Sequence, residues 1–389
     1  MVGRLQIIKQ VLLLFIFILY NSYSQTVSGI SSEIKVLMPF SFTRIGAANI
    51  GKGNAAIAEE GNPAAAFINP SALHTDSMMI YLEGGKRNHI DWIMDVELDG
   101  PLILPAYIAI LKSTNLGTIS AGYYQFYNIS YKDFFTVVTL EHPEGTGELF
   151  EVSSKTKIHS FFCSGSYLLK ESIRFGLTFS LNYLTEFDQI YNSKGEGSGL
   201  GIQLIGGVLS KPVENLNVAA VFKYTGDIKY DLKLEGPDFD LQIDTTGIYG
   251  NNPPIDASLK SNGYPFIVKF PWSLELGCSY NFLQYYTFLA KLDFQRWAHL
   301  GESYLDKTQI HSGIEIAVSP ILKCSLGFFT QYHPSKYNEE YYDQKFFTIG
   351  FEHSFMRNCS LAVTFMDSHL FYNKEFLQTY IASSVSINF

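Results

Sequence analysis

The segment PWSLELGCSYNF, residues 271–282, alternates apolar and polar side chains over its whole length. Its even-numbered positions are Trp, Leu, Leu, Cys, Tyr and Phe, and Ser, Glu, Gly, Ser and Asn stand between them. Successive side chains of a β-strand point to opposite faces, so this period of two predicts a strand with one apolar and one polar face. Tyr286 to Gln295 repeat the pattern after a short gap, which predicts a hairpin.

The same alternation fits twelve further segments and gives fourteen predicted strands. They are 78–86, 103–112, 116–126, 156–169, 172–184, 199–209, 216–225, 309–318, 321–331, 345–354, 358–367 and 377–389. The gaps between strands are alternately short and long, as are the periplasmic turns and external loops of a bacterial outer-membrane barrel. Within 87–155 the strand boundaries permit other choices.

Composition favours a membrane barrel over a soluble protein. The chain of 389 residues contains 31 Phe and 25 Tyr, and only 17% of its residues are charged, against about a quarter in soluble domains. No apolar stretch after residue 24 approaches the ~18–20 residues of a membrane helix. A soluble β-sandwich or β-helix also has alternating strands, but sandwiches rarely need strands of about eleven residues. We therefore predict an all-β fold, a transmembrane antiparallel β-barrel of about 14 strands.

The N-terminus has the pattern of a secretory signal peptide, which we place at residues 1–24. Arg4 and Lys9 precede and flank an apolar run from residue 11 to 18, and the small residues Ser22 and Ser24 follow. Export then leads to the cell outer membrane as the expected location, with outer-membrane lipid as a partner. The net charge of -9 argues against nucleic acid as a partner.

The four cysteines occupy the same alternate positions of their predicted strands as the apolar residues do. Cys163, Cys278, Cys324 and Cys359 are therefore expected to face lipid as small apolar side chains. The last three lie on strands that are not neighbours, and two strand spacings exceed the ~7 Å limit between bridged Cα atoms. We expect no disulfide among them.

A segment without strand character, residues 25–77, precedes the first strand. Its core, RIGAANIGKGNAAIAEEGNPAAAFINPSAL at 44–73, combines a Gly-rich approach, an Ala-rich acidic stretch and an Asn-Pro turn. This order resembles the N-terminal hatch of the FadL-type outer-membrane transporters of hydrophobic compounds, with Ser in place of their usual Ala after Asn-Pro. The matching hatch residues are Gly51, Gly53, Asn69, Pro70 and Ser71. Residues 270–274 and 293–297 are also similar to central strands of that family.

The resemblance implies a plug at 25–77 inside a barrel at 78–389. A fourteen-stranded barrel has a lumen that its own side chains do not fill, so an open one would leak solutes. Small residues and prolines suit a compact segment within that space. A rigid stopper and a moving gate are both compatible with this sequence.

The resemblance also implies passive uptake of hydrophobic compounds such as long-chain fatty acids. The external loops 127–155 and 226–270 would capture them, and a hatch-gated lateral exit would release them through the wall. The candidate capture residues are Phe134, Phe135, Phe239 and Tyr249. Their rings are equally compatible with an aromatic girdle and ordinary loop packing.

A fatty acid also needs a cation for its carboxylate. Arg44 lies in the hatch segment, and by parity Arg174 and Lys291 project inward, so these three are the candidate ligand-binding cations. The competing interpretation is a charge network within the lumen, in which Glu275 and Asp293 pair with such residues.

No motif demands catalysis, a metal or a cofactor. The chain has no Gly-x-Ser-x-Gly elbow, no His-Glu-x-x-His and no complete phosphate loop, and the Asp residues at 238–244 depart from EF-hand spacing. The expected ligands are hydrophobic small molecules or fatty acids. The alternative function is a barrel similar to PorV and PorQ, which docks proteins of type IX secretion; its partners would be secretion-system proteins.

Overall fold

The computed structural model describes residues 33–36, 42, 44–91, 102–136, 149–170, 172–190, 193–235, 263–336, 343–371 and 376–389. The chain divides into two units, Met1–Glu33 and Ile34–Phe389, and the second holds nearly all of the regular structure. The predicted signal peptide lies outside the described residues.

Strands dominate the second unit. They are β1 (Glu33–Val36), β2 (Met78–Asp91), β3 (Leu102–Thr114), β4 (Gly117–Thr136), β5 (Leu149–Lys170), β6 (Ile173–Ile190), β7 (Ser193–Val213), β8 (Leu216–Thr225), β9 (Ile228–Glu235), β10 (Tyr264–Lys269), β11 (Trp272–Phe282), β12 (Tyr286–Arg296), β13 (Lys307–Ser319), β14 (Leu322–Gln331), β15 (Gln344–Met356), β16 (Cys359–Asp367) and β17 (Phe376–Asn388). The helices are short: α2 (Ala47–Gly51), η2 (Ala56–Ala58), α3 (Ala65–Ile68), η3 (Pro70–Ala72), η5 (Ala298–Leu300) and η6 (His369–Phe371).

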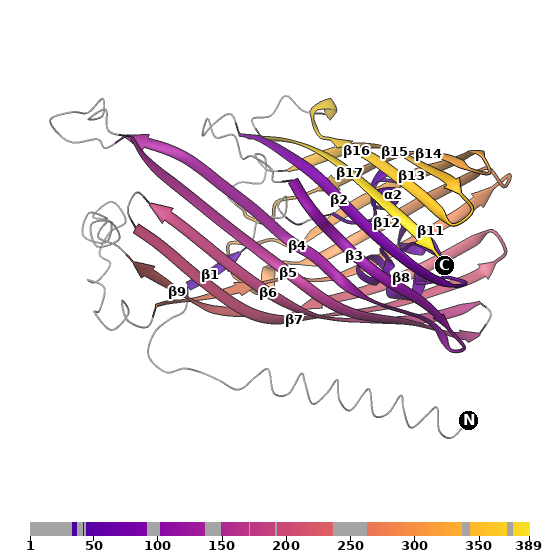
Figure 1. Cartoon of the computed structure of the whole chain (residues 1–389), viewed down its shortest axis with the longest axis horizontal. Coiled ribbons are helices and arrows are strands. Elements are labelled where there is room, and N and C mark those ends of the chain that lie inside the picture. Colours follow the sequence, from indigo (N-terminus) through magenta and orange to yellow (C-terminus); the bar gives the residue numbers. More distant parts are fainter. Residues whose placement is uncertain are drawn as a thin grey trace, which may run out of the picture. The chain divides into compact units, whose positions relative to one another are not determined.

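The strands close into a barrel (Figure 1). Seven strands from β2 to β8 and seven from β11 to β17 pair antiparallel with their neighbours in sequence. The ring closes where β17 pairs with β2 and β8 with β11, for example through Ser386 opposite Tyr81 and Leu276 opposite Ala220. The predicted closed antiparallel barrel of fourteen strands is confirmed.

Two neighbouring strands of this ring are interrupted. β9 continues the course of β8 after a break at 226–227, and β10 precedes β11 across a break at 270–271. β9 pairs with both β10 and β7, so the wall continues beyond the two breaks.

Strand cores agree with the sequence prediction, but several strands are longer. β4, β5 and β7 contain 20, 22 and 21 residues, about twice the ~9–11 that cross a bilayer. The prediction of loops at 127–155 and 226–270 was therefore wrong in part, since these ranges contain the ends of β4 and β5, all of β9 and all of β10. Inter-strand hydrogen bonds persist there although the apolar alternation that marks a lipid-facing strand has ended.

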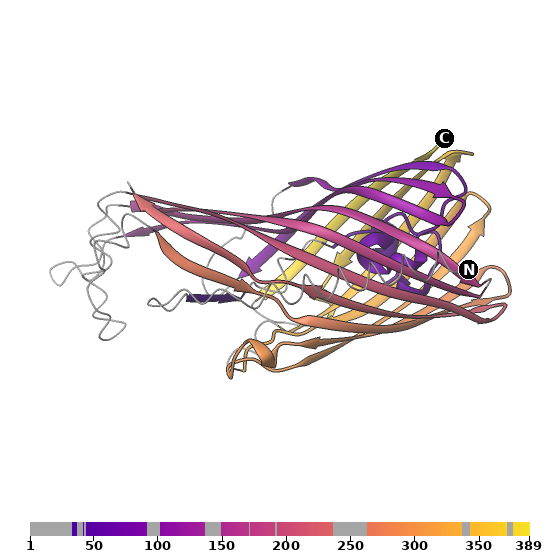
Figure 2. The ribbon, with the colours of Figure 1, turned by 90° about the horizontal axis from the view of Figure 1, so that it is seen from below.

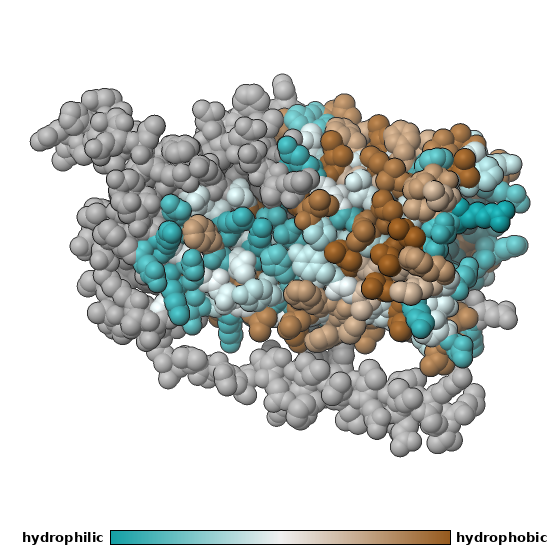
Figure 3. Space-filling model, in the orientation of Figure 1, coloured by the Kyte–Doolittle hydropathy of each residue, from teal (hydrophilic) through white to brown (hydrophobic). Residues whose placement is uncertain are grey.

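Side-chain parity is as predicted: apolar residues face outward and polar ones inward. Leu276, Leu292 and Ile310 are 49%, 50% and 51% exposed, while Glu275 and His311 on the opposite faces are 3% and 2% exposed. Figure 3 shows the apolar side chains gathered over the half of the barrel in which the C-terminus lies. The long strand ends on the other half carry hydrophilic side chains. On this face the apolar surface therefore forms a band over part of the barrel's length.

The cysteines also follow the predicted parity. Cys163 is exposed, the other three are partly exposed, and all four are free thiols. Among the described residues, no helix is both long enough and apolar enough to cross a bilayer.

Candidate functional site

Residues 44–77 are here called the luminal segment, and residues 44–73 of it lie inside the barrel. Figures 1 and 2 show its short helices between the walls. α2 contacts β14 to β17, η2 contacts β8, β11 and β12, and η3 contacts β5 to β7. The segment thus touches the wall on opposite sides of the lumen.

Hydroxyl groups of the wall bind the backbone of this segment. Inward-facing side chains donate to its carbonyl oxygens: Thr364 to Ala47 (2.8 Å), Thr348 to Gly51 (3.0 Å), Ser279 to Ala58 (3.1 Å), Thr178 to Ala66 (2.5 Å) and Ser166 to Leu73 (2.7 Å). Helices of three to five residues leave most of their own backbone groups unsatisfied. The wall supplies the missing partners and so fixes the position of the segment.

Gly51 and Gly53 of the predicted hatch motif lie where backbone meets backbone. A Cβ on Gly53 would lie 2.3 Å from the carbonyl oxygen of Ser312, and its φ of +68° is one that other residues rarely adopt. A Cβ on Gly51 would lie 2.7 Å from the Cα of Gly350. Only glycine allows α2 to end this close to the wall.

The Asn-Pro-Ser turn is held by the side chain of Asn69. Its Oδ1 accepts from the backbone N–H (3.1 Å) and the hydroxyl (2.6 Å) of Ser71, and its Nδ2 donates to the carbonyl oxygen of Ile57 (2.8 Å). Pro70 occupies the first position of η3, where no N–H is needed. Ser71, which departs from the family's Ala, is satisfied within the motif.

A set of wall glycines was missed by the sequence analysis. They lie on the inward parity of their strands, and a Cβ on any of them would clash with the luminal segment: Gly176, Gly207, Gly277, Gly313 and Gly327. At Gly327, for example, the Cβ would lie 2.1 Å from the backbone nitrogen of Gly53. In the sequence they are recognisable as glycines at the positions of a long strand where polar residues otherwise stand. A glycine there marks a place where another segment of the chain comes close to the strand's backbone.

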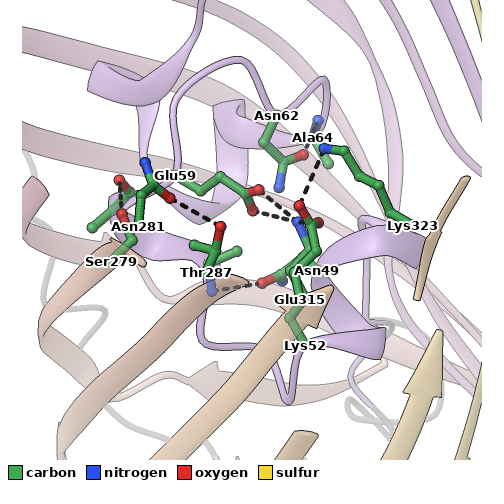
Figure 4. Close-up of polar contacts among 12 residues, drawn as sticks. Asn49, Lys52, Glu59, Asn62, Ala64, Ser279, Asn281, Thr287, Glu315 and Lys323 are labelled. Carbon is green, nitrogen blue, oxygen red and sulfur yellow. Dashed lines mark hydrogen bonds and ion pairs between the residues drawn. The ribbon is translucent and has the colours of Figure 1, made fainter. Parts of the chain in front are cut away.

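An ion-pair cluster around the buried Lys52 and Glu315 joins the luminal segment to β13 and β14 (Figure 4). Lys52 pairs with Glu59 at 2.5 Å and with Glu315, and Lys323 pairs with Glu315 at 3.1 Å. Burial alone would lower the pKa of Lys52, but Glu59 and Glu315 together raise it above the ordinary lysine value. Lys52 is therefore cationic at neutral pH and holds the segment to the wall.

Arg44 is partly buried at the start of the luminal segment. Its guanidinium lies 4.4 Å from the ring centroid of Phe329 and 5.7 Å from that of Phe346, and it donates to the side-chain oxygen of Gln331. Burial, and to a smaller extent the positive charge of the nearby Arg87, lowers the pKa of Arg44 to about 10. Arg44 is still a cation at neutral pH, stabilised by the aromatic faces.

The other two predicted cations are engaged with carboxylates of the protein. Arg174 pairs with Glu60 of the luminal segment at 2.6 Å. Lys291 lies 3.3 Å from Glu275, which also pairs with Lys223 at 2.6 Å. These contacts form the charge network within the lumen that was the alternative interpretation of these cations.

A cavity of about 250 Å³ lies between the luminal segment and the wall. One part of its lining is aromatic: Phe42, Phe67, Tyr124, Phe126, Phe270 and Trp297. The other part is polar and includes Arg44, Asn54, Lys223, Glu275, Lys291, Asp293, Gln309 and His311. Such a lining suits a molecule with an apolar body and a polar end.

This cavity reaches the wall at the breaks between β8 and β9 and between β10 and β11. Thr225, Phe270 and Pro271 all line it. β8 and β11 pair as far as Lys223 opposite Ser273, and β9 and β10 resume at Ile228 opposite Val268. Pro271 has no N–H to donate, so the cavity meets the wall where inter-strand pairing is missing.

A smaller cavity of about 130 Å³ has a different lining, which includes Lys52, Glu59, Asn62 and Lys323. The two cavities share no lining residue. Residues of the luminal segment contribute to both, so the segment lies between them.

The predicted capture residues lie partly in a strand and partly outside the described residues. Phe134 and Phe135 belong to β4, with Cα atoms opposite those of Glu151 and Phe150, so placing them in a loop was wrong. Phe239 and Tyr249 lie outside the described residues. Within the described part of the chain, no group of three or more His, Cys, Asp or Glu side chains is arranged to hold a metal ion.

Comparison with solved structures finds the same architecture in transport proteins. The toluene transporter TbuX of Ralstonia pickettii matches with a TM-score of 0.66 at 12% identity, over 90% of this chain and 100% of that one. The toluene transporter TodX of Pseudomonas putida matches with a TM-score of 0.61 at 15% identity, over 90% and 100%. A FadL homologue of Pseudomonas aeruginosa matches with a TM-score of 0.60 at 11% identity, again over 90% and 100%.

No family model matches the sequence, and no curated protein matches it. At such low identities the structural matches establish the fold. The chain has the fold of the FadL-type outer-membrane channels, as the hatch motif and the strand pattern predicted.

Proposed function

We propose that this protein is an outer-membrane channel for the passive uptake of hydrophobic compounds. The observation that carries the proposal is the cavity inside the barrel, with its six aromatic side chains and its contact with the interrupted wall at Phe270 and Pro271. Apolar molecules leave water for such a lining spontaneously. The fold shared with toluene transporters supports this class of ligand.

The exterior supports a location in the outer membrane. Leu276, Leu292 and Ile310 expose apolar surface at matching outward positions of three neighbouring strands. Soluble monomers rarely expose apolar patches above a few hundred Å². On β6, five exposed apolar side chains lie between Phe175 and Tyr183, which fits the ~9–11 residues that cross a bilayer. The protein is then an exported one, with lipid around its apolar band.

In this proposal the luminal segment is a plug. It lies between the two cavities and is bonded to the wall through hydroxyl groups and ion pairs from Ser166 to Thr364. So many anchors favour a segment that stays in place and blocks the axial route. A hydrophobic molecule would enter the aromatic cavity from the side of the long loops. It would leave sideways through the wall, at the breaks between β8 and β9 and between β10 and β11.

Long-chain fatty acids belong to this ligand class. Of the three cations predicted to receive a carboxylate, Arg174 and Lys291 already pair with Glu60 and Glu275. Arg44 makes a hydrogen bond and ring contacts but no ion pair with a described residue. Arg44 is therefore the group that a carboxylate would approach.

Uptake of labelled p-xylene by cells lacking their own hydrophobic-compound channels tests the proposal. Expression of the protein should raise the initial rate. The Ser273→Trp variant fills the cavity beside the broken wall and should abolish the increase. Leu274→Trp, whose side chain faces outward, is the matched control and should retain it. A rate equal to that of cells without the protein would refute the channel function.

The projecting ends of β4 to β7 favour one alternative. They extend the wall beyond the apolar band and offer a surface on which an exported protein could dock, as in the PorV-like and PorQ-like barrels of type IX secretion. A docking barrel would co-purify with a secretion-system protein and would give no p-xylene uptake.

A further inference from the structure

The polar part of the aromatic cavity contains buried atoms without a protein partner. Asn54 Nδ2, Asp293 Oδ1 and His311 Nε2 make no hydrogen bond with the described residues, and their side chains line this one cavity. The three residues are 8%, 6% and 2% exposed. Buried polar groups in folded proteins almost always have partners, so three such atoms around one cavity point to a ligand.

The partners of neighbouring atoms fix what each group offers. His311 Nδ1 lies 3.0 Å from the carbonyl oxygen of Gly53 and must donate to it, so the neutral ring presents a lone pair on Nε2. Asp293 Oδ2 accepts from Gln295 at 2.9 Å, which leaves Oδ1 as an acceptor. Asn54 Oδ1 accepts from Asn49 at 3.3 Å, which leaves the Nδ2 amide as a donor.

The three groups lie near one another. Lys291 of β12 is opposite His311 of β13, and Asp293 is opposite Gln309. Asp293 and His311 are therefore diagonal neighbours on the inward face, at a Cα separation of about 7–8 Å. Asn54 directly follows the residue whose carbonyl oxygen binds His311. Two acceptors and one donor thus belong to the polar part of the lining of one cavity.

This combination fits a hydroxyl group better than a carboxylate. A hydroxyl donates to Asp293 or His311 and accepts from Asn54 with its oxygen. A carboxylate only accepts, so it would face two acceptors. The cations of the cavity offer little compensation at this point, because Lys223 and Lys291 both pair with Glu275. Arg44, the cation left for a carboxylate, lies against Phe329 and Gln331.

Resting on the proposed uptake of hydrophobic compounds, we propose that the cavity selects small hydroxylated aromatic compounds, such as phenols. The aromatic side chains pack the ring, and the three polar groups bind the hydroxyl. A volume of about 250 Å³ is below the ~300–1,000 Å³ of pockets for drug-sized ligands. A single ring with a hydroxyl and a small substituent suits that size.

Three probes with the same p-tolyl body test the selection: p-cresol, p-xylene and 4-methylbenzoate. Each is titrated calorimetrically into the detergent-solubilised full-length protein, with empty micelles of the same detergent as the blank. We expect p-cresol to bind at least tenfold more tightly than either of the others, about 1.4 kcal/mol.

The Asn54→Asp variant replaces the unpartnered amide donor by an acceptor without changing the side-chain size. It should bring the affinity for p-cresol to within threefold of that for p-xylene. Asn62→Asp is the matched control, because Asn62 lies in the same segment but lines the other cavity, and it should retain the preference. His311→Phe keeps a flat ring against Phe329 and should also reduce the preference.

The outcomes separate this inference from the function on which it rests. Equal binding of p-cresol and p-xylene overturns the hydroxyl selection and leaves the channel intact, with only water at the polar groups. Tightest binding of 4-methylbenzoate overturns it in favour of a carboxylate ligand. Binding of none of the three by protein that keeps its β-sheet circular dichroism overturns the uptake function as well.

Discussion

Gly207 of β7 lies directly against the side chain of Asn69, so that a Cβ at position 207 would be 2.1 Å from Asn69 Oδ1. The adjacent Gly206 faces the other way, and a Cβ there would meet no atom within 4 Å. One missing methyl group on the inward face thus makes room for the Asn-Pro-Ser turn of the luminal segment.

Gly207→Ala should displace this turn from the wall. Because the new Cβ overlaps Asn69 Oδ1, the bonds to Ser71 must lengthen or break, at a cost of about 1–3 kcal/mol. Hydrogen exchange of the Ser71 amide should accelerate in Gly207→Ala. Gly206→Ala controls for the loss of glycine flexibility, and equal exchange in both variants would contradict the proposed contact.

Lys52→Met should destabilise the protein strongly. Only 4% of the Lys52 side chain is exposed, and its loss leaves Glu59 and part of Glu315 without a counter-charge. Removing one member of a buried pair costs about 3–5 kcal/mol. Urea unfolding in lipid vesicles measures the change. The double variant Lys52→Met, Glu315→Gln should recover part of the loss, and full additivity of the two substitutions would show that they do not interact.

The stabilising effect of Lys52 should disappear at high pH. Since its pKa is raised in the folded protein, its contribution is complete below the ordinary lysine pKa of about 10.4 and is lost as pH rises toward the folded value. Wild type and Lys52→Met should therefore converge in stability above pH ~10.4. A constant difference from pH 8 to 12 would be inconsistent with this assignment.

Leu276→Arg should impair insertion into a bilayer. Its outward position lies within β11, and an arginine at the bilayer midplane of a barrel costs about 2–4 kcal/mol. Leu283→Arg in the turn after β11 places the same charge at the end of the hairpin, where the cost falls to about 0–1 kcal/mol. Folding titrations of both variants in vesicles give the comparison, and similar costs would place position 276 outside the lipid.

Acid should loosen the turn after β14. Burial, and to a smaller extent the positive charge of Lys307, lowers the pKa of His333 to about 4. In the neutral ring, Nδ1 accepts a hydrogen bond from the backbone N–H of Ser335 at 3.3 Å. The neutral ring therefore contributes stability above the unfolded pKa of about 6.5, and this is lost as pH falls toward 4.

Hydrogen exchange of the Ser335 amide, corrected for its intrinsic pH dependence, measures the loss between pH 6.5 and 4. In His333→Asn the side-chain oxygen can still accept but does not titrate in this range, so protection should stay constant. A wild-type profile as flat as that of the variant would argue against the histidine as the cause.

The barrel was predictable because lipid imposes a simple rule on sequence. β11 and β12 agree with prediction to within a residue or two, since each outward side chain must be apolar and each inward one faces polar surroundings. Beyond the apolar band that rule ends, so the extensions of β4 to β7 were missed. β9 and β10 were missed for the same reason. In the extensions of β4 and β5, Phe135 and Phe150 still lie opposite each other in the ladder.

The site was predictable only in part. The hatch motif identified Gly51, Gly53 and Asn69, whose conformations demand those residue types. Parity located Arg174 and Lys291 on the inward face, but the ion pairs that occupy them depend on the luminal segment and on strand register. Likewise, Asn54, Asp293 and His311 meet only after residues some 240 to 260 positions apart in the sequence come together.

α2 of the luminal segment is made early and finds its wall partners late. Gly53 bonds to Thr348, 295 residues later, and Ala47 to Thr364, 317 residues later. Contacts of such separation carry a large loop-closure entropy and slow folding. α2 must therefore wait without its hydroxyl partners until β15 and β16 have been made, and the barrel has to close around it. A chain interrupted before β15 would contain every residue of the hatch motif and none of the hydroxyl groups that hold α2.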